Sequence, residues 1–220
     1  MRAVVVTPKE PSSGRLTEVP DPQLREGDVL VRVHQVALDG TDAEILAGEY
    51  GEAPPGDDYL TIGHESLGRV EGMTQGAEDL APGEWVVAMV RRPDPAPCRN
   101  CAAGEWDMCL NGQYTERGIK GRHGFLAEYY AETPNFLVKV PRELATFAVL
   151  LEPLSIVEKA VEQMKRIQSR LVWQPERAVV LGAGPPPMAG QSEMTLELDL
   201  SLPSWTVRRP SAAWNCCSSP

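Results

Sequence analysis

Three separated fragments carry side chains that could together bind a metal ion. Asp39 follows an expected strand at residues 28–38, His64-Glu65 follows a Pro- and Gly-rich stretch, and Glu152 stands just before an expected long helix. Imidazole and carboxylate groups are sound zinc ligands, and a catalytic zinc usually takes three protein ligands and leaves a fourth position open. Spacing alone leaves other readings open: Asp39 as a turn residue, His64-Glu65 as a surface pair, and Glu152 as a carboxylate that flanks a helix.

A second group of possible metal ligands is the pattern Cys98-x2-Cys101-x7-Cys109. Three thiolates do not close a tetrahedral structural zinc site, and a fourth ligand would have to come from a carboxylate such as Asp94. The alternative is a surface lobe of reduced, packed cysteines. A disulfide framework is not expected, because a cytoplasmic protein keeps its thiols reduced.

The elements that must position these side chains are short strands separated by Gly/Pro turns, over residues 1 to about 150. Within residues 28–38, Val29, Val31 and Val33 alternate with unlike residues, which is the period-2 pattern of a strand with two different faces. Further strands are expected at Ala3–Val6, Leu67–Val70, Trp85–Val90, Phe125–Ala131 and Leu137–Val140. The sequence therefore predicts a small, irregular, mostly β domain with short helices.

One short helix is expected at about residues 42–47. Thr41 stands at its start and Glu44 follows three residues later, which is the pattern of a capping box. In that interpretation the Thr41 hydroxyl and the Glu44 carboxylate satisfy backbone N–H groups that have no partner within the helix.

The pattern of the sequence changes at about residue 155. Ser155 and Glu158 form a second expected capping box, and apolar residues follow at helical spacing. The apolar run Ala178–Leu181 is suited to a parallel strand that is buried on both faces. Together with the turn Gly182-Ala183-Gly184 it predicts the truncated beginning of an α/β Rossmann domain, whose helix cannot continue through Pro185-Pro186-Pro187.

Composition limits the classes of protein to be considered. The chain has 220 residues, 31 acidic against 21 basic side chains, and a formal net charge of −10. No apolar run approaches the roughly 20 residues that span a bilayer, and an acidic surface repels phosphate backbones. We therefore expect a soluble, cytoplasmic protein that binds neither membrane nor nucleic acid. The scarcity of lysine relative to arginine fits a protein from a high-salt cytoplasm or, equally, a GC-rich genome.

Several fragments occur in the order found in zinc-dependent medium-chain alcohol and sugar dehydrogenases. They are Asp39-Gly40-Thr41-Asp42, Gly63-His64-Glu65, Pro82-Gly83-Glu84-Trp85-Val86, Glu152-Pro153-Leu154 and Val180-Leu181-Gly182-Ala183-Gly184-Pro185. Over residues 1 to about 185 the chain resembles archaeal glucose dehydrogenases, above all those of salt-loving organisms. The resemblance implies a GroES-like catalytic domain at 1–154, the start of a nucleotide-binding domain at 155–185, and an out-of-pattern tail at 186–220.

The resemblance also implies roles for the candidate metal ligands. Asp39, His64 and Glu152 are implied as ligands of a catalytic zinc, and Glu65 as a close or exchanging ligand that takes part in catalysis. Asp39 stands where most of the family has a cysteine. Thr41 is implied to place its hydroxyl near the reacting oxygen of the substrate, as a member of a proton relay.

Further roles concern the substrate, the cofactor and the cysteines. Thr41, Glu116 and Glu152 are implied to contact the sugar, although Glu116 could equally be an ordinary loop carboxylate. Gly182 and Gly184 are implied to bind NADP or NAD. The three cysteines match the last three ligands of the family's structural zinc lobe, and the first ligand would fall at Pro95.

The implied activity is oxidation of an aldose, glucose, at C1 to the lactone, with NADP or NAD as hydride acceptor and zinc polarising the reacting hydroxyl. A reading-frame shift near codon 185 would explain the loss of pattern, and would leave the chain deficient in cofactor binding. The alternatives are a non-catalytic metal- or sugar-binding remnant of such an enzyme, or a zinc-free quinone reductase of the same superfamily. Family members form homo-oligomers, but their interfaces lie largely in the second domain, so oligomerisation is not assumed.

Overall fold

The computed structural model describes residues 1–77, 79–173, 177–181, 195–199 and 206–208. These residues fall in two compact units, Met1–Lys159 and Ala160–Pro220. None of the helices within these ranges is long and apolar enough to cross a membrane.

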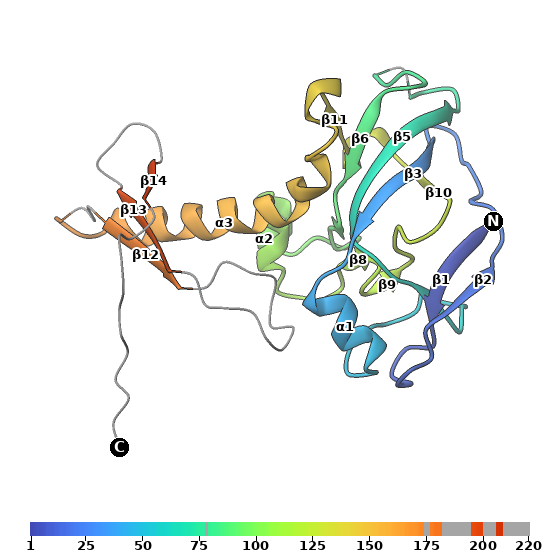
Figure 1. The fold of residues 1–220 in the computed structure, drawn as a ribbon, viewed down its shortest axis with the longest axis horizontal. Helices are drawn as coiled ribbons and strands as arrows, with labels where there is room; N and C mark the ends of the chain where they lie inside the picture. The colour runs from blue at the N-terminus through green and yellow to red at the C-terminus, as the bar shows by residue number, and fades with distance from the viewer. Residues whose placement is uncertain (78, 174–176, 182–194, 200–205, 209–220) are drawn as a thin grey trace. The chain divides into compact units, whose positions relative to one another are not determined.

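The largest sheet of the first unit has five antiparallel strands in the order β10-β3-β5-β6-β11 (Figure 1). The strands are β3 (Val29–Ala37), β5 (Glu65–Met73), β6 (Trp85–Ala88), β10 (Tyr129–Glu132) and β11 (Leu137–Val140). Val29 and Val31 are fully buried and Arg32 is exposed, so the alternation in the sequence predicts the faces of β3 correctly. The mostly β fold class is confirmed.

The strand expected at residues 125–131 is shorter than predicted, because β10 begins only at Tyr129. The N–H groups of Phe125 and Leu126 donate to the carbonyls of Gly63 and Ile62, at 2.8 and 2.9 Å. This segment therefore holds the chain around Gly63, directly before one of the candidate metal ligands.

Two smaller sheets complete the strands of the first unit, in the orders β2-β1-β4 and β7-β8-β9. Their strands are β1 (Arg2–Val6), β2 (Arg15–Glu18), β4 (Leu60–Thr61), β7 (Arg91–Arg92), β8 (Thr115–Arg117) and β9 (Gly121–Arg122). The run expected as one strand at Trp85–Val90 ends at Ala88, and the chain then enters β7. Strand β8 therefore lies beside residues that come directly after the large sheet.

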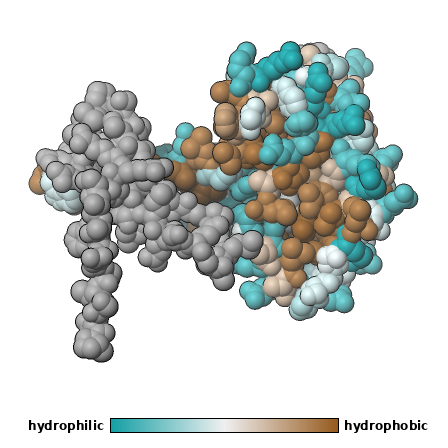
Figure 2. All heavy atoms as spheres, in the orientation of Figure 1, coloured by the Kyte–Doolittle hydropathy of each residue, from teal (hydrophilic) through white to brown (hydrophobic). Residues whose placement is uncertain are grey.

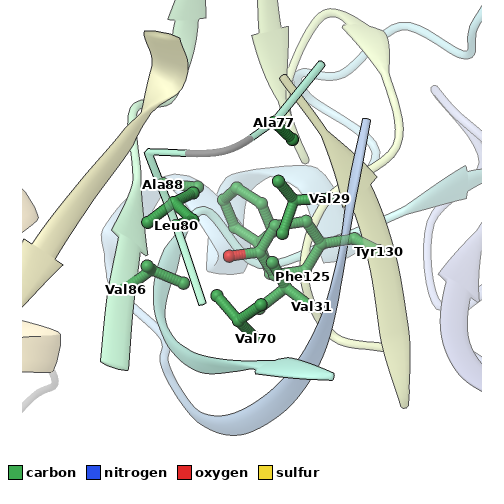
Figure 3. Packing of buried hydrophobic residues seen from close by; sticks show 9 residues of the cluster. All are labelled: Val29, Val31, Val70, Ala77, Leu80, Val86, Ala88, Phe125 and Tyr130. Carbon is green, nitrogen blue, oxygen red and sulfur yellow. The ribbon is translucent and has the colours of Figure 1, made fainter. Parts of the chain in front are cut away.

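Buried apolar side chains pack against the large sheet. They include Val29, Val31, Val70, Val86 and Phe125, each at most 2% exposed (Figure 3). The rings of Phe125 and Tyr130 lie 4.7 Å apart at a tilt of 59°, a favourable aromatic arrangement. This cluster anchors β3 and β5, the two strands whose ends carry candidate ligands.

A buried carboxylate links the large sheet to the small β7-β8-β9 sheet. Glu132 of β10 is 2% exposed, and its Oε2 accepts hydrogen bonds from Arg92 of β7 and from Nε and Nη2 of Arg117 of β8. Arg122 of β9 lies 3.5 Å from Oε1. One side chain thus ties together all three strands of the small sheet.

The helix α1 (Gly40–Leu46) begins earlier than the sequence analysis predicted, and Thr41 is not its cap. Asp39 is the N-cap: its Oδ1 accepts from the N–H groups of Thr41 and Asp42, at 2.8 and 3.3 Å. Asp42 completes the capping box by accepting from the N–H of Asp39 at 3.2 Å. Aspartate is among the strongest N-cap residues, so a carboxylate two positions earlier displaces the expected threonine cap.

The long helix α3 (Leu151–Gln168) begins four residues before the expected capping box at Ser155. Ser155 lies inside the helix, where its hydroxyl donates to the Glu152 carbonyl at 2.6 Å. Pro153 falls in the first turn, where a backbone N–H would have no partner within the helix, so it does not break α3. Glu152 therefore stands in the first turn of a helix rather than before it.

The apolar side chains of α3 are not covered by the described residues. Ile156, Val157 and Ile167 are each more than half exposed, and none of the 18 residues of α3 is buried. Apolar side chains reach the surface around the beginning of this helix (Figure 2). A helix with this pattern normally buries that stripe against another element.

Within the second unit, β12 (Arg177–Leu181), β13 (Thr195–Asp199) and β14 (Thr206–Arg208) form an antiparallel sheet. The expectation of a parallel strand at 178–181 is therefore wrong: an apolar run specifies a strand but not the direction of its partner. Gly182 and Gly184 lie outside the described residues.

The remaining helical segments are short. They are α2 (Arg99–Ala102) and the 3₁₀ helices η1 (Trp106–Met108), η2 (Pro134–Phe136), η3 (Arg142–Leu144) and η4 (Ala148–Leu150).

Candidate metal centre

Three of the predicted ligands come together at one end of the large sheet. Asp39 comes two residues after the end of β3, and His64 directly precedes Glu65, the first residue of β5. The β3–β5 register pairs Ala37 with Glu65. One ligand atom from each of Asp39, His64 and Glu65 lies within 4.8 Å of the others. His64 and Glu65 are buried, at 5% and 6% exposure, so the reading of this dipeptide as a surface pair is wrong.

The two oxygens of Asp39 have different tasks. Oδ1 caps α1, as described above, whereas Oδ2 lies 3.7 Å from Nε2 of His64. The hydroxyl of Thr41 donates to the same Oδ2 at 3.4 Å. The structure therefore places the Thr41 hydroxyl against a candidate ligand, while the capping role passes to Asp39.

Asp42 is a further candidate site residue, which the sequence reasoning did not select. Its Oδ2 lies 3.5 Å from Nδ1 of His64, and its Oδ1 accepts from the N–H of Gly63 at 3.0 Å. Metal-binding histidines usually face a carboxylate or carbonyl with their second ring nitrogen, which fixes the orientation of the ring. In the sequence, Asp42 is recognisable only as an acidic residue three positions after the N-cap. Its contact with His64, 22 positions away, is set by the fold.

Close backbone packing aims His64 at this cluster. Gly63 has φ of +83°, and a Cβ there would lie 2.8 Å from Cγ1 of Val36. Cβ atoms on Gly118 and Gly124 would lie 2.6 and 2.4 Å from the Gly63 carbonyl oxygen. Only glycine fits such an approach, so these three residues form a junction that sets the path of the chain into His64.

Glu152 lies outside this close group but within its electrostatic reach. Burial raises the pKa of its carboxyl, and the charges of Glu65 and Asp39 act in the same direction. The side chain is half-buried in the first turn of α3. The structure thus brings Asp39, His64 and Glu65 together and leaves Glu152 at the margin of the group.

The electrostatics of the group suit a cation. Burial raises the pKa of Asp42 and of Glu65, and neighbouring carboxylates raise both further, opposed by His64. Crowded, half-desolvated carboxylates disfavour their own ionisation, and a divalent cation would relieve that repulsion. The donor set of one imidazole nitrogen and several carboxylate oxygens fits zinc, though it is harder than a thiolate-containing set.

Glu116 lies in β8 rather than in a loop, directly opposite Arg91 of β7. Nε and Nη2 of Arg91 donate to its Oε1, at 3.0 and 2.7 Å. The charge of Glu116 contributes to the raised pKa of Glu152, although less than burial does. The carboxylate predicted to contact sugar therefore lies within electrostatic reach of the metal group.

The cysteines form a second group of possible ligands. The sulfurs of Cys98, Cys101 and Cys109 lie within 4.8 Å of one another, and all three are free thiols. Asp94 is buried, with Oδ2 3.9 Å from Sγ of Cys109. Hydrogen bonds from the N–H groups of Leu110 and Cys101 lower the pKa of Cys98 to about 6. The lobe thus presents three sulfurs and a nearby carboxylate.

Comparison with known proteins agrees with this architecture. The family model of the alcohol dehydrogenase GroES-like domain matches residues 25–142, and that of the glucose dehydrogenase C-terminus matches 145–201. The glucose 1-dehydrogenase of Methanocella arvoryzae is 50% identical over 185 residues, 84% of this chain and 52% of the relative. Glucose 1-dehydrogenase 1 of Caldivirga maquilingensis is 44% identical over 211 residues, 96% of this chain and 58% of the relative.

A solved structure gives the same result. The glucose dehydrogenase of Haloferax mediterranei, in complex with NADP, Zn and gluconolactone, superposes with a TM-score of 0.70 and 37% identity, covering 80% of this chain and 49% of that one. A β-rich domain with this imidazole–carboxylate group and a cysteine lobe defines the zinc-dependent medium-chain dehydrogenase class. The chain belongs to the alcohol dehydrogenase GroES-like family. It spans about half the length of the curated relatives it matches.

Proposed function

We propose that this chain is the catalytic part of a zinc-dependent dehydrogenase that oxidises glucose at C1 to the lactone, with NADP or NAD as hydride acceptor. The observation that carries the proposal is the group of Asp39, His64 and Glu65, whose ligand atoms lie within 4.8 Å of one another. The names of the relatives, which are glucose 1-dehydrogenases, suggest the substrate. The NADP in the Haloferax mediterranei enzyme suggests the cofactor.

In this proposal Asp39, His64 and Glu152 hold the zinc, and Glu65 is a close or exchanging ligand. When bound, zinc supplies Lewis acidity that lowers the pKa of the reacting sugar hydroxyl. Asp42 keeps the His64 ring oriented through its contact with Nδ1. The buried setting of His64 and Glu65 excludes water and strengthens every charge interaction in the group.

The proton and the sugar are handled by other side chains. Thr41 hydrogen-bonds Asp39 through its hydroxyl and is the proposed first member of the proton relay. Glu116 is the proposed acceptor of sugar hydroxyl hydrogen bonds, and Glu152 borders the same space. The hydride acceptor itself performs the redox chemistry, and the protein contributes position and electrostatics.

Gly182 and Gly184 are the proposed phosphate-binding turn for NADP or NAD. The domain division also stays a proposal: catalytic domain 1–154, start of the nucleotide-binding domain 155–185, and tail 186–220.

A second candidate is a non-catalytic metal- or sugar-binding remnant of such an enzyme. Titration with NADP separates the two candidates: measurable binding supports the enzyme, and its absence together with retained zinc and glucose binding supports the remnant.

Metal analysis tests the proposed zinc site directly. We expect zinc to bind the wild-type chain and to be lost from the His64→Ala variant, while variants of the cysteine lobe retain it at the Asp39 group. A chain that binds no zinc would instead support the zinc-free quinone reductase reading. A cytoplasmic location also remains a prediction, whereas neither an occupied zinc in the cysteine lobe nor a homo-oligomer is assumed.

A further inference from the structure

One arginine lies between Glu116 and the cysteine lobe. Arg91 stands directly opposite Glu116 in the β7–β8 pair, and two of its nitrogens donate to the single oxygen Oε1, at 3.0 and 2.7 Å. No described residue donates a hydrogen bond to Oε2 of Glu116. Arg91 therefore fixes the position of Oε1 and leaves the second oxygen, Oε2, to accept a hydrogen bond from a ligand.

The other side of the same guanidinium reaches the cysteine lobe. Nη1 of Arg91 lies 3.4 Å from the carbonyl oxygen of Trp106, in the 3₁₀ helix between Cys101 and Cys109. The guanidinium also lies over the ring of Tyr114, 3.9 Å from its centroid. Because the guanidinium is planar and rigid, a movement at the Trp106 carbonyl is passed to the nitrogens that hold Glu116.

A second connection follows the chain out of the lobe. Nζ of Lys120 donates to the carbonyl of Gly112 at 2.7 Å and lies 4.2 Å from the centroid of the Tyr114 ring. The Tyr114 ring thus contacts two cations: Arg91, which pairs with Glu116, and Lys120, which lies four residues after Glu116 in the chain. The lobe and the β8 segment are joined at two places.

We propose that Arg91 is a positioning residue that couples the cysteine lobe to Glu116, so that a metal bound by Cys98, Cys101 and Cys109 tightens sugar binding. Thiolate–zinc bonds of about 2.3 Å would fix the loop that carries the Trp106 carbonyl. Arg91 then holds Glu116 in one orientation and reduces the entropy lost when the sugar binds. The inference rests on the proposed function in taking Glu116 as the sugar-binding carboxylate.

The first test needs no sugar. The full chain, loaded with zinc and labelled with ¹³C-glutamate, is titrated with Cd²⁺, and ultraviolet thiolate–Cd²⁺ absorption reports filling of the lobe. The ¹³C carboxyl signal of Glu116, assigned by its loss in Glu116→Gln, is expected to shift in the wild type and to stay fixed in Arg91→Gln. An equal shift in Arg91→Gln overturns the proposal, as does a lobe that shows no thiolate absorption with Cd²⁺.

Two further variants separate the hydrogen-bond geometry of Arg91 from its charge, and from the effect of changing any arginine in this region. Arg91→Lys keeps the charge but lacks the two guanidinium donors, so it is expected to behave like Arg91→Gln. If Arg91→Lys kept the full shift of the Glu116 carboxyl signal, the proposed role of the paired donors would be overturned. Arg91→Lys also replaces Arg91→Gln in the test if the glutamine variant does not fold. Arg99→Gln changes an exposed arginine of α2 in the same lobe and is expected to match the wild type.

The second test measures glucose affinity by calorimetry. Filling the lobe with Cd²⁺ is expected to tighten glucose binding roughly 5- to 30-fold in the wild type, as one or two kcal/mol would, and to have no effect in Arg91→Gln. An equal gain in both chains overturns the coupling. If the wild type binds no glucose, the sugar assignment of the proposed function fails, while the ¹³C measurement still decides the role of Arg91.

Discussion

Nδ1 of His64 lies 3.5 Å from Oδ2 of Asp42, while Nε2 of the same ring lies 3.7 Å from Oδ2 of Asp39. The imidazole therefore lies between two carboxylates, one facing each ring nitrogen. Asp42 itself is fixed by the N–H groups of Gly63 and Asp39. Asp42 thus places a fixed negative charge behind the ring, although it contributes no ligand atom to the group of Asp39, His64 and Glu65.

Replacing Asp42 by asparagine should weaken zinc binding while leaving the chain folded. The amide keeps the shape of the side chain but removes the charge behind the imidazole, and such changes typically cost 10- to 100-fold in metal affinity. Competition with a chromophoric chelator measures the affinity. Asp58→Asn, at an exposed position, is the control. Equal affinity in both variants would show that Asp42 does not support His64.

Two substitutions at Asp39 should separate its two tasks. Asp39→Asn keeps a good N-cap and should lower zinc affinity without loss of folding stability. Asp39→Cys supplies a thiolate and should slow metal loss to EDTA, but removal of the cap should lower the free energy of unfolding by about 1 kcal/mol. Stopped-flow metal release and chemical denaturation measure the two effects. Unchanged release from Asp39→Cys would mean that Asp39 is not a ligand.

Gly63→Ala should disturb the metal site through the backbone. Its Cβ would press on Val36 at 2.8 Å, and the resulting shift would move His64. Gly56→Ala is a matched control, since Gly56 also has positive φ (+95°) but open space around its Cα. Gly63→Ala should be less stable than the control by about 1–3 kcal/mol and should alone lose zinc affinity. Equal denaturation midpoints and affinities would count against the glycine junction.

Glu132→Gln should destabilise the first unit strongly. The substitution leaves Arg92 and Arg117 buried without their carboxylate, and breaking a buried pair in this way typically costs about 3–5 kcal/mol. Glu143→Gln, at an exposed position, should change the free energy of unfolding little. Urea denaturation of both variants tests this expectation, which a loss below about 1 kcal/mol in Glu132→Gln would contradict.

The same carboxylate should produce an acid-dependent loss of stability. Burial alone would raise the pKa of Glu132, but Arg117, Arg92 and Arg122 outweigh it and hold the pKa below its usual value. A lowered pKa means stability that is present above the unfolded pKa of about 4.3 and is lost as the pH falls through the folded pKa. The difference in unfolding free energy between wild type and Glu132→Gln should therefore narrow below about pH 4. A difference in unfolding free energy that stays constant from about pH 3 to about pH 7 would contradict this expectation.

Local patterns predicted much of the fold and selected three residues whose ligand atoms lie together. The alternation of Val29 and Val31 gave the faces of β3, and Asp39, His64 and Glu65 were selected by residue type, order and family resemblance. The direction of β12 was not predictable, because an apolar run does not encode its partner. Nor was the cap of α1, since Asp39 and Thr41, two positions apart, are both good cap residues. The contacts of Asp42 with His64 and of Arg91 with Glu116 were not predictable, because the partners are distant in sequence.

The division of labour within Asp39 has a consequence for which ions the group accepts. A large ion such as calcium usually takes some carboxylates through both oxygens. Using both oxygens of Asp39 would withdraw Oδ1 from α1 and cost the helix about 1 kcal/mol, close to a fivefold loss of affinity. Zinc, satisfied by one oxygen, leaves the cap intact. The capping bond of a seven-residue helix would thus disfavour an ion that needs both oxygens of Asp39.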